Sequence, residues 1–328
     1  MYSYNIVMEN WVEQCKIYVS PNIHSNSILH CGYHENGVIA NSSDYLGLRA
    51  GNGKGLIMDM YNRCKNRPAH NISDEEVVSF ISSFTNGTVH GYVAIYEFIL
   101  HYLKNNMTAR VLLCTKTQGG IRQLVSHCIG EDKIITLDVG KTYQYKQIYF
   151  IPVTEMHFSD SFWKKNNHAC MKLLVNPEFD NGGKHHLCVM KTEECNTNVG
   201  VISVKDASAF CEKNNLYFLR PVTHNEINTA NLIWNCESIV FSWGTSYYKN
   251  LRYIGDKCKK IYVIVSDGFI EQYNSRKRPH FRPNSHVYKT YRNADVKYII
   301  CKGGYANLTI EHMEAHGIVH DHCVYTDE

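Results

Sequence analysis

The chain has little proline, no long hydrophobic run and no recognisable targeting segment. Seven prolines against 23 tyrosines among 328 residues argue against a disordered or fibrous protein. No window approaches the roughly 18 apolar residues that a membrane-spanning helix requires. The opening residues, MYSYNIVMENWVEQCK, lack the basic stretch and the following apolar stretch of a secretory signal. We therefore expect a globular protein in the cytoplasm, without a membrane span.

The net charge and the cysteine spacing indicate which ligands and cross-links the chain is expected to have. A formal charge of +3 is too small to indicate nucleic acid binding by itself. The most basic segment, RKRPHFR at 276–282, is typical of a solvated loop, although such a segment could also bind phosphate or RNA. The thirteen cysteines are an odd number without a repeated spacing, which fits reduced thiols better than disulfides or structural zinc.

Apolar runs alternate with helical patterns along most of the chain, which predicts parallel sheets covered by helices. A length of 328 residues suggests two domains. The turn Asn181-Gly182-Gly183 precedes a restart of the same rhythm. We therefore predict an α/β protein with two Rossmann-like domains, an N-terminal domain at 1–170 and a C-terminal nucleotide-binding domain at 171–328. The predicted strands of the two halves lie at 110–114, 133–137, 147–151, 186–190, 216–219, 238–241, 260–265 and 295–301.

The N-terminal 71 residues are harder to interpret and show only short strand-like runs, such as those at 16–19 and 27–30. After them, Ser73-Asp74-Glu75-Glu76 has the pattern of a capped helix start that leads into Val77 and Val78. A longer helix is predicted from about His90 to Lys104, because its apolar residues keep to one face.

The segment 216–250 has the succession expected of a nucleotide-binding unit. A short apolar run ends at Arg220-Pro221, and Thr223 is expected to cap a helix, with Glu226 three residues later as in a capping box. A buried strand at 238–241 then leads into the turn Ser242-Trp243-Gly244-Thr245-Ser246. Such a turn, at the carboxyl end of a parallel strand and before a helix, offers N–H groups and hydroxyls to an anion. A tight strand-to-helix turn without a ligand is the alternative.

These segments resemble glycosyltransferase family 61 over roughly residues 85–265. In the first half, TVHGY opens a long helix and is followed by VLLCTK and GEDKIITLDVGKTYQYKQIYFIP, in the order of the family's elements. In the second half, the helix 226–236, the strand SIVF and the turn WGTS match the family's most recognisable segment. Trp243 stands where the family usually has His, and Lys249 stands where its Asn would fall, with Asn250 next.

The resemblance implies an inverting glycosyltransferase of GT-B-type architecture, with two Rossmann-like domains facing a cleft. Its donor would be a UDP-sugar, with xylose or N-acetylglucosamine as the sugar, and its acceptor a hydroxyl of a glycan or glycoprotein. The absence of an Asp-x-Asp motif favours transfer without a metal ion, and no cofactor other than the donor is expected. The richness in Asn, Lys and Tyr, without a secretory signal, resembles glycosyltransferases encoded by large DNA viruses.

Two other functions stay open. One is a non-catalytic glycan- or nucleotide-binding module on the same fold, which the departures at Trp243 and Lys249 would allow. The other is a transferase that uses a different activated donor, such as a pyruvyl or methyl donor.

Sugar transfer requires a proton acceptor for the incoming hydroxyl and stabilisation of the departing diphosphate. His90 is the preferred base, because imidazole accepts a proton near neutral pH, although a capping or core role fits it equally well. The candidate catalytic residues are His90, Glu97 and Asp138. The candidate donor-binding residues are Lys191, Arg220, Thr223, Ser242, Gly244, Thr245, Ser246 and Lys249. For Arg220, a surface ion pair is the competing interpretation.

Overall fold

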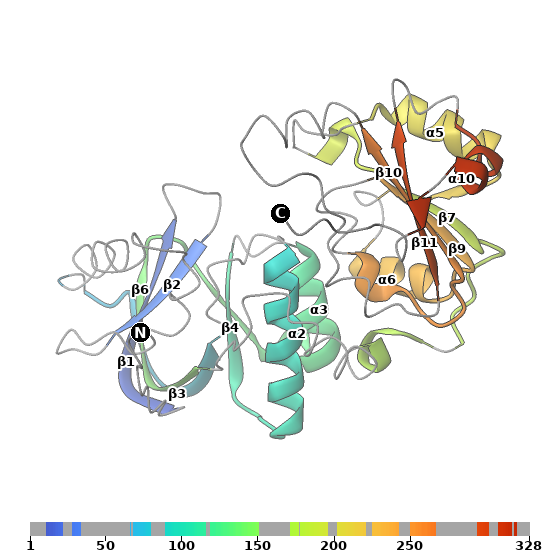
Figure 1. Ribbon diagram of the computed structural model, residues 1–328. Coiled ribbons are helices and arrows are strands. Elements are labelled where there is room, and N and C mark those ends of the chain that lie inside the picture. The colour runs from blue at the N-terminus through green and yellow to red at the C-terminus, as the bar shows by residue number, and fades with distance from the viewer. Residues whose placement is uncertain are drawn as a thin grey trace, which may run out of the picture. The chain divides into compact units, whose positions relative to one another are not determined.

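The computed structural model of the chain describes residues 11–21, 28–33, 66, 68–79, 89–115, 119–150, 171–176, 178–195, 202–220, 225–242, 250–266, 294–301, 308–316 and 318–319. The chain divides into two compact units, Met1–His157 and Phe158–Glu328. Each unit has a six-stranded, largely parallel sheet with helices between its strands (Figure 1). The predicted α/β class is therefore confirmed.

The first unit has strand order β2-β1-β6-β3-β4-β5. Strands β6, β3, β4 and β5 are parallel, whereas β1 pairs antiparallel with both β2 and β6. Helices α2 and α3 connect β3 to β4 and β4 to β5, and they lie side by side (Figure 1). Elements of this unit are β1 Trp11–Pro21, β2 Ile28–Tyr33, β3 Asn71–Ser79, α2 Val89–Lys104, β4 Arg110–Cys114, α3 Gly119–Ile129, η2 Glu131–Lys133, β5 Ile134–Leu137 and β6 Thr142–Phe150.

The helix predicted to begin at Ser73 is wrong, because this segment belongs to strand β3. Val77 and Val78 are fully buried and pair with both β4 and β6, an environment that suits β-branched side chains. The backbone N–H of Glu75 donates to Ser73 Oγ at 3.2 Å, where the register with β6 shifts. A serine hydroxyl that accepts a hydrogen bond from a nearby backbone N–H is compatible with a β-bulge as well as with a helix start. The local sequence pattern therefore did not distinguish the two.

The second unit has strand order β12-β11-β10-β9-β7-β8, with β12 antiparallel and the other five strands parallel. In chain order the parallel strands follow the 2-1-3-4-5 arrangement of one kind of doubly wound sheet, and the order reverses between β7 and β9. Its elements are β7 His186–Val189, η3 Glu193–Cys195, α5 Val204–Lys213, β8 Tyr217–Phe218, α6 Glu226–Trp234, β9 Ser238–Ser242, η4 Leu251–Tyr253, β10 Lys260–Ser266, β11 Asp295–Cys301, α10 Ile310–His316 and β12 Ile318–Val319.

Strand β9 is buried along its whole length, as its apolar sequence predicts for a central parallel strand. On one face of the sheet, Phe210 of α5 and Met313 of α10 pack with Val240 and Tyr262 in a single apolar cluster. Ser203 is the N-cap of helix α5, and its hydroxyl accepts a hydrogen bond from the N–H of Asp206 at 3.0 Å. The sheet therefore shares one hydrophobic core with α5 and α10.

The start of α6 differs from the prediction. Its N-cap is Asn225, whose side-chain oxygen accepts from the N–H of Asn228 at 2.7 Å. Asparagine caps helices at least as well as threonine, so the helix begins after Asn225 rather than after Thr223. Thr223 itself lies outside the described residues.

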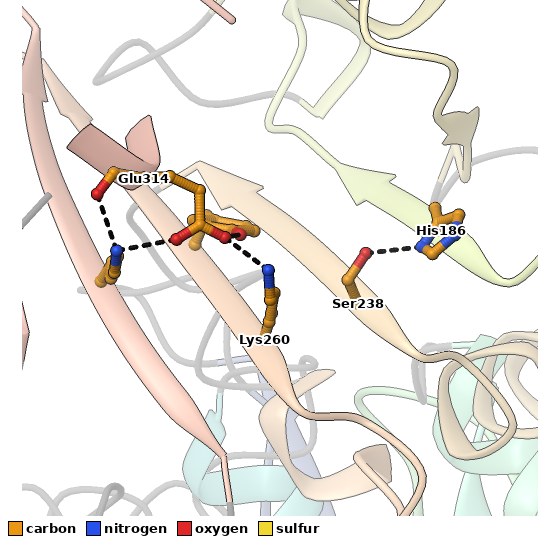
Figure 2. Close-up of polar contacts among 6 residues, drawn as sticks. His186, Ser238, Lys260 and Glu314 are labelled. Carbon is orange, nitrogen blue, oxygen red and sulfur yellow. Dashed lines mark hydrogen bonds and ion pairs between the residues drawn. The ribbon is translucent and has the colours of Figure 1, made fainter. Parts of the chain in front are cut away.

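Glu314 attaches α10 to the amino ends of β10 and β11 (Figure 2). Its carboxylate accepts from Lys260 Nζ at 2.7 Å, from Lys297 Nζ at 2.8 Å and from the hydroxyl of Tyr262. Hydrogen bonds from Lys260, Lys297 and Tyr262 lower the pKa of Glu314 to about 2. At the same edge, His186 Nδ1 lies 2.9 Å from Ser238 Oγ and joins β7 to β9 (Figure 2).

Candidate functional site

The carboxyl ends of β7 and β9 flank the point where the strand order of the second unit reverses. Doubly wound sheets bind their ligands at this point, because the crossover connections leave in opposite directions there. Ser242 ends β9, and Lys191 follows β7 by two residues. The backbone N–H of Lys191 donates to Ser242 Oγ at 2.7 Å. Two of the predicted donor-binding residues therefore lie together at the reversal point.

Backbone contacts hold the segment after β7 against the start of α5. The N–H of Ile202 donates to the carbonyl of Lys191 at 3.0 Å, and Thr192 forms a parallel bridge with Ile202. The carboxylate of Glu193 accepts from the N–H of Val204 at 2.8 Å, so it caps the helix. The backbone of Lys191 is thus fixed on both sides, while the residue itself is half-buried at the edge of the sheet.

Arg220 follows β8, the strand next to β7, and forms an ion pair with Glu194 through its Nη2. About a third of each side chain is exposed, at 35% for Arg220 and 32% for Glu194. The ion pair thus holds Arg220 beside η3, and η3 begins two residues after Lys191. Glu194 did not stand out in the sequence, because nothing in its local pattern marks it as the partner of a residue 26 positions away.

Asn250 is a buried polar residue just before η4, with 2% of its surface exposed. Among the described residues, its Oδ1 atom is one of the few buried side-chain atoms without a hydrogen-bond partner. Leaving a buried polar group unsatisfied costs about 1–3 kcal/mol, so such an atom points to a missing ligand contact or to strain. The resemblance to the glycosyltransferase family places an Asn one position earlier, which was the signal that could have identified Asn250.

A buried pair fixes the position of η4, which directly follows Asn250. The hydroxyl of Tyr253 donates to the carboxylate of Glu226, and Glu226 is only 5% exposed. Glu226 starts α6, whose first turn lies at the carboxyl edge of the sheet because α6 follows β8. This contact ties η4, which directly follows Asn250, to the first turn of α6. The sequence suggested only a capping role for Glu226.

In the first unit, His90 and Glu97 lie in α2, with His90 in the first turn, but their side chains are outside the described part. Asp138 follows β5 and pairs with Lys141 Nζ at 2.8 Å. Its N–H donates to the hydroxyl of Tyr143 at 2.9 Å.

Thr223 and the loop after β9 were also predicted to bind the donor. These residues, Thr223, Gly244, Thr245, Ser246 and Lys249, lie outside the described part of the chain. Of the predicted donor-binding set, the structure therefore describes Lys191, Arg220 and Ser242.

No protein-family model and no curated protein matches this chain. Within the described ranges, no helix is both long and apolar enough to cross a membrane. In the same ranges, no group of three or more His, Cys, Asp or Glu side chains is placed to hold a metal ion. Lys191 and Ser242 supply an ammonium group and a hydroxyl at the reversal point of the parallel sheet, and Arg220 adds a guanidinium after the neighbouring strand β8. Such a set is suited to an anionic, polar ligand.

Proposed function

We propose that the protein is a glycosyltransferase that binds a UDP-sugar at the carboxyl edge of its second unit and transfers the sugar to a hydroxyl of a glycan or glycoprotein. The observation that carries the proposal is the hydrogen bond between Lys191 and Ser242 at the reversal point of a 2-1-3-4-5 sheet. Nucleotides are bound at this position in doubly wound folds. The resemblance to glycosyltransferase family 61 supplies the reaction type.

Each described residue has a role in this proposal. Lys191 places a positive charge where the departing diphosphate gains negative charge, which lowers the barrier to departure. The Oδ1 atom of Asn250 accepts a hydrogen bond from a ribose hydroxyl or from the N–H of the uracil ring. Arg220, held by Glu194, contributes a second cation on the β8 side. The loop after β9 supplies further donors in the proposal, through Gly244, Thr245 and Ser246.

The acceptor is assigned to the first unit, in a GT-B-type arrangement. His90 is preferred as the base, since it lies in the first turn of α2 and imidazole titrates near neutral pH. Asp138 ranks below it, because Lys141 already engages its carboxylate. The transfer then needs no metal ion, with lysine and backbone donors neutralising the diphosphate.

The first test is UDP binding by calorimetry, with and without a chelator, on wild type and on Lys191→Ala. Loss of a charge-assisted contact of about 1.5 kcal/mol weakens binding roughly tenfold. Lys213→Ala is the matched control, because Lys213 is an exposed lysine at the far end of α5, and it should bind UDP as wild type does. Equal affinity for all three proteins would remove Lys191 from the site.

The second test is UDP release from a panel of UDP-sugars with glycan and peptide acceptors. His90→Ala should retain UDP binding and lose turnover, since a base acts on the acceptor and not on the nucleotide. UDP binding without turnover on any donor would favour the non-catalytic module. Failure of UDP to bind or to raise the melting temperature would favour a different activated donor.

A further inference from the structure

Two cysteines from separate segments face each other at the amino edge of the second sheet. Cys236 lies between α6 and β9, and Cys258 lies between η4 and β10. Strands β9 and β10 pair in parallel register with Ser238 opposite Lys260. Counting two residues back along each strand places Cys236 opposite Cys258. The N–H of Lys259 donates to the carbonyl of Glu237 at 2.9 Å, so the parallel pairing extends beyond the strands toward the cysteines.

Two further contacts hold the segment before β9 close to the segment before β10. Gly255 lies so close to Trp234 that a Cβ atom at Gly255 would be 2.3 Å from the carbonyl oxygen of Trp234. Lys257 Nζ donates to the side-chain oxygen of Asn235 at 3.2 Å. The approach of the two segments is therefore fixed on both sides of the cysteines by packing and by hydrogen bonds.

We propose that Cys236 and Cys258 form a reversible dithiol–disulfide pair. Neighbouring parallel strands lie about 4.8 Å apart, which is inside the Cα separation of about 4.4–6.8 Å that a disulfide can span. Both cysteines are free thiols and are buried, at 0% and 2% exposure. The inference stands on this juxtaposition and does not depend on the proposed transferase activity.

The environment distinguishes the two thiols chemically. A hydrogen bond from the Cys236 thiol lowers the pKa of the Cys258 thiol, and the charge of Lys259 adds to this effect. Cys258 is therefore the thiol that first becomes a thiolate, the form that attacks a disulfide. It lies between Lys257 and Lys259, both exposed, so a small opening of this turn admits a reagent.

The oxidation balances with a small-molecule disulfide as the oxidant. The thiolate of Cys258 attacks one sulfur of oxidised glutathione, forms a mixed disulfide and releases one glutathione thiolate, which takes up a proton. Cys236 then loses its proton and attacks the sulfur of Cys258, which forms the Cys236–Cys258 bond and releases the second glutathione. Two electrons and two protons pass to glutathione, and a dithiol reductant reverses both steps.

The new bond would close a loop that contains the whole of β9, Ser242 and Asn250. Oxidation would thus join the two ends of the segment that carries much of the candidate site. Constraining a loop of this length stabilises the folded state by reducing the freedom of the unfolded chain. We expect the thermal midpoint of the second unit to rise by roughly 5 °C on oxidation and to return on reduction.

Another pair of buried thiols provides an internal comparison. Cys188 of β7 and Cys211 of α5 also share a hydrogen bond, and burial raises the pKa of Cys188. Both lie within regular elements, strand β7 and helix α5, in the main apolar cluster. Oxidation of the folded protein should therefore link Cys236 to Cys258 before it links Cys188 to Cys211.

The test is oxidation of the full-length folded protein by oxidised glutathione, followed by alkylation, proteolysis and mass spectrometry without reduction. The expected result is a linked peptide pair with Cys236 and Cys258, its loss after dithiothreitol, and the rise in thermal midpoint. In Cys258→Ser both signals disappear, whereas Cys128→Ser in α3 keeps them. Absence of the linked pair in wild type, or equal linkage of Cys188 to Cys211, would overturn the proposal without the need for any variant to fold.

Discussion

Replacing Glu314 by glutamine should destabilise the second unit at neutral pH and have little effect near pH 2. The carboxylate joins α10 to β10 and β11 through Lys260, Lys297 and Tyr262. Glutamine keeps the shape and one acceptor oxygen but removes the charge that both lysines compensate. The variant therefore measures how much the ionised carboxylate, rather than the packing of α10, contributes to stability.

The magnitude follows from the pKa of Glu314, which falls from an ordinary 4.5 to about 2 in the folded protein. One pKa unit corresponds to about 1.4 kcal/mol, so the full difference sets an upper limit of about 3 kcal/mol. A third of the side chain is exposed, at 33%, and solvent screens its ion pairs. After this discount we expect a loss of about 1–2 kcal/mol in the free energy of unfolding.

The sign of the pH dependence is set by the lowered pKa. The stabilisation is complete above the unfolded pKa of 4.5 and is lost as the pH falls toward the folded pKa of about 2. The difference between wild type and Glu314→Gln should therefore shrink steadily from pH 5 to pH 2. Urea unfolding at several pH values measures it, with hydrogen exchange of β10 and β11 reporting on this unit alone.

Glu311→Gln is the control, because it removes the same charge from the first turn of the same helix, where Glu311 is exposed. It should change stability by no more than about 0.5 kcal/mol. A loss at Glu314 equal to that at Glu311, or a loss that persists unchanged at pH 3, would refute the assignment of stability to the ionised carboxylate.

Two further substitutions test the site and its support. Ser242→Ala removes the acceptor of the Lys191 N–H and should lower the free energy of unfolding by about 1–2 kcal/mol, as measured by urea unfolding. It should also weaken UDP binding, as measured by calorimetry. Full stability would show that water or another group replaces the hydroxyl. Gly255→Ala forces a Cβ against the backbone of Trp234 and should cost at least about 2 kcal/mol, whereas Gly119→Ala meets nothing within 4 Å and should be neutral in the same unfolding assay.

Much of the fold could be predicted because apolar runs and turns are local signals. Strands β4, β9 and β10 were each predicted to within a residue or two, since their buried faces make nearly continuous apolar runs. Strand β3 was not, because Ser73 and the acidic residues after it match a helix start as well as a bulged strand. Only pairing with β4 and β6 decides between them, and pairing is not a local property.

The candidate site, like the fold, has features that the sequence shows locally and features that arise only from tertiary packing. That Ser242 follows a buried strand is visible in the sequence, but its contact with Lys191 depends on β7 and β9 being neighbours while β8 lies outside them. Strand order is set by tertiary packing and has no local signature. The ion pair of Arg220 with Glu194 and the burial of Asn250 likewise arise only when separate segments meet.

Buried polar groups of the second unit differ in how they are satisfied, and this difference separates structural contacts from a candidate ligand contact. At the amino edge, Glu314 is saturated by Lys260, Lys297 and Tyr262, and His186 bonds Ser238. Each of these groups has its hydrogen-bond partners within the chain, so we assign the groups a structural role. In the connection from β9 to β10, among the described residues, the buried Oδ1 of Asn250 has no such partner. Because a buried polar atom without a partner is costly, we expect the proposed ligand to supply a donor to Asn250 Oδ1.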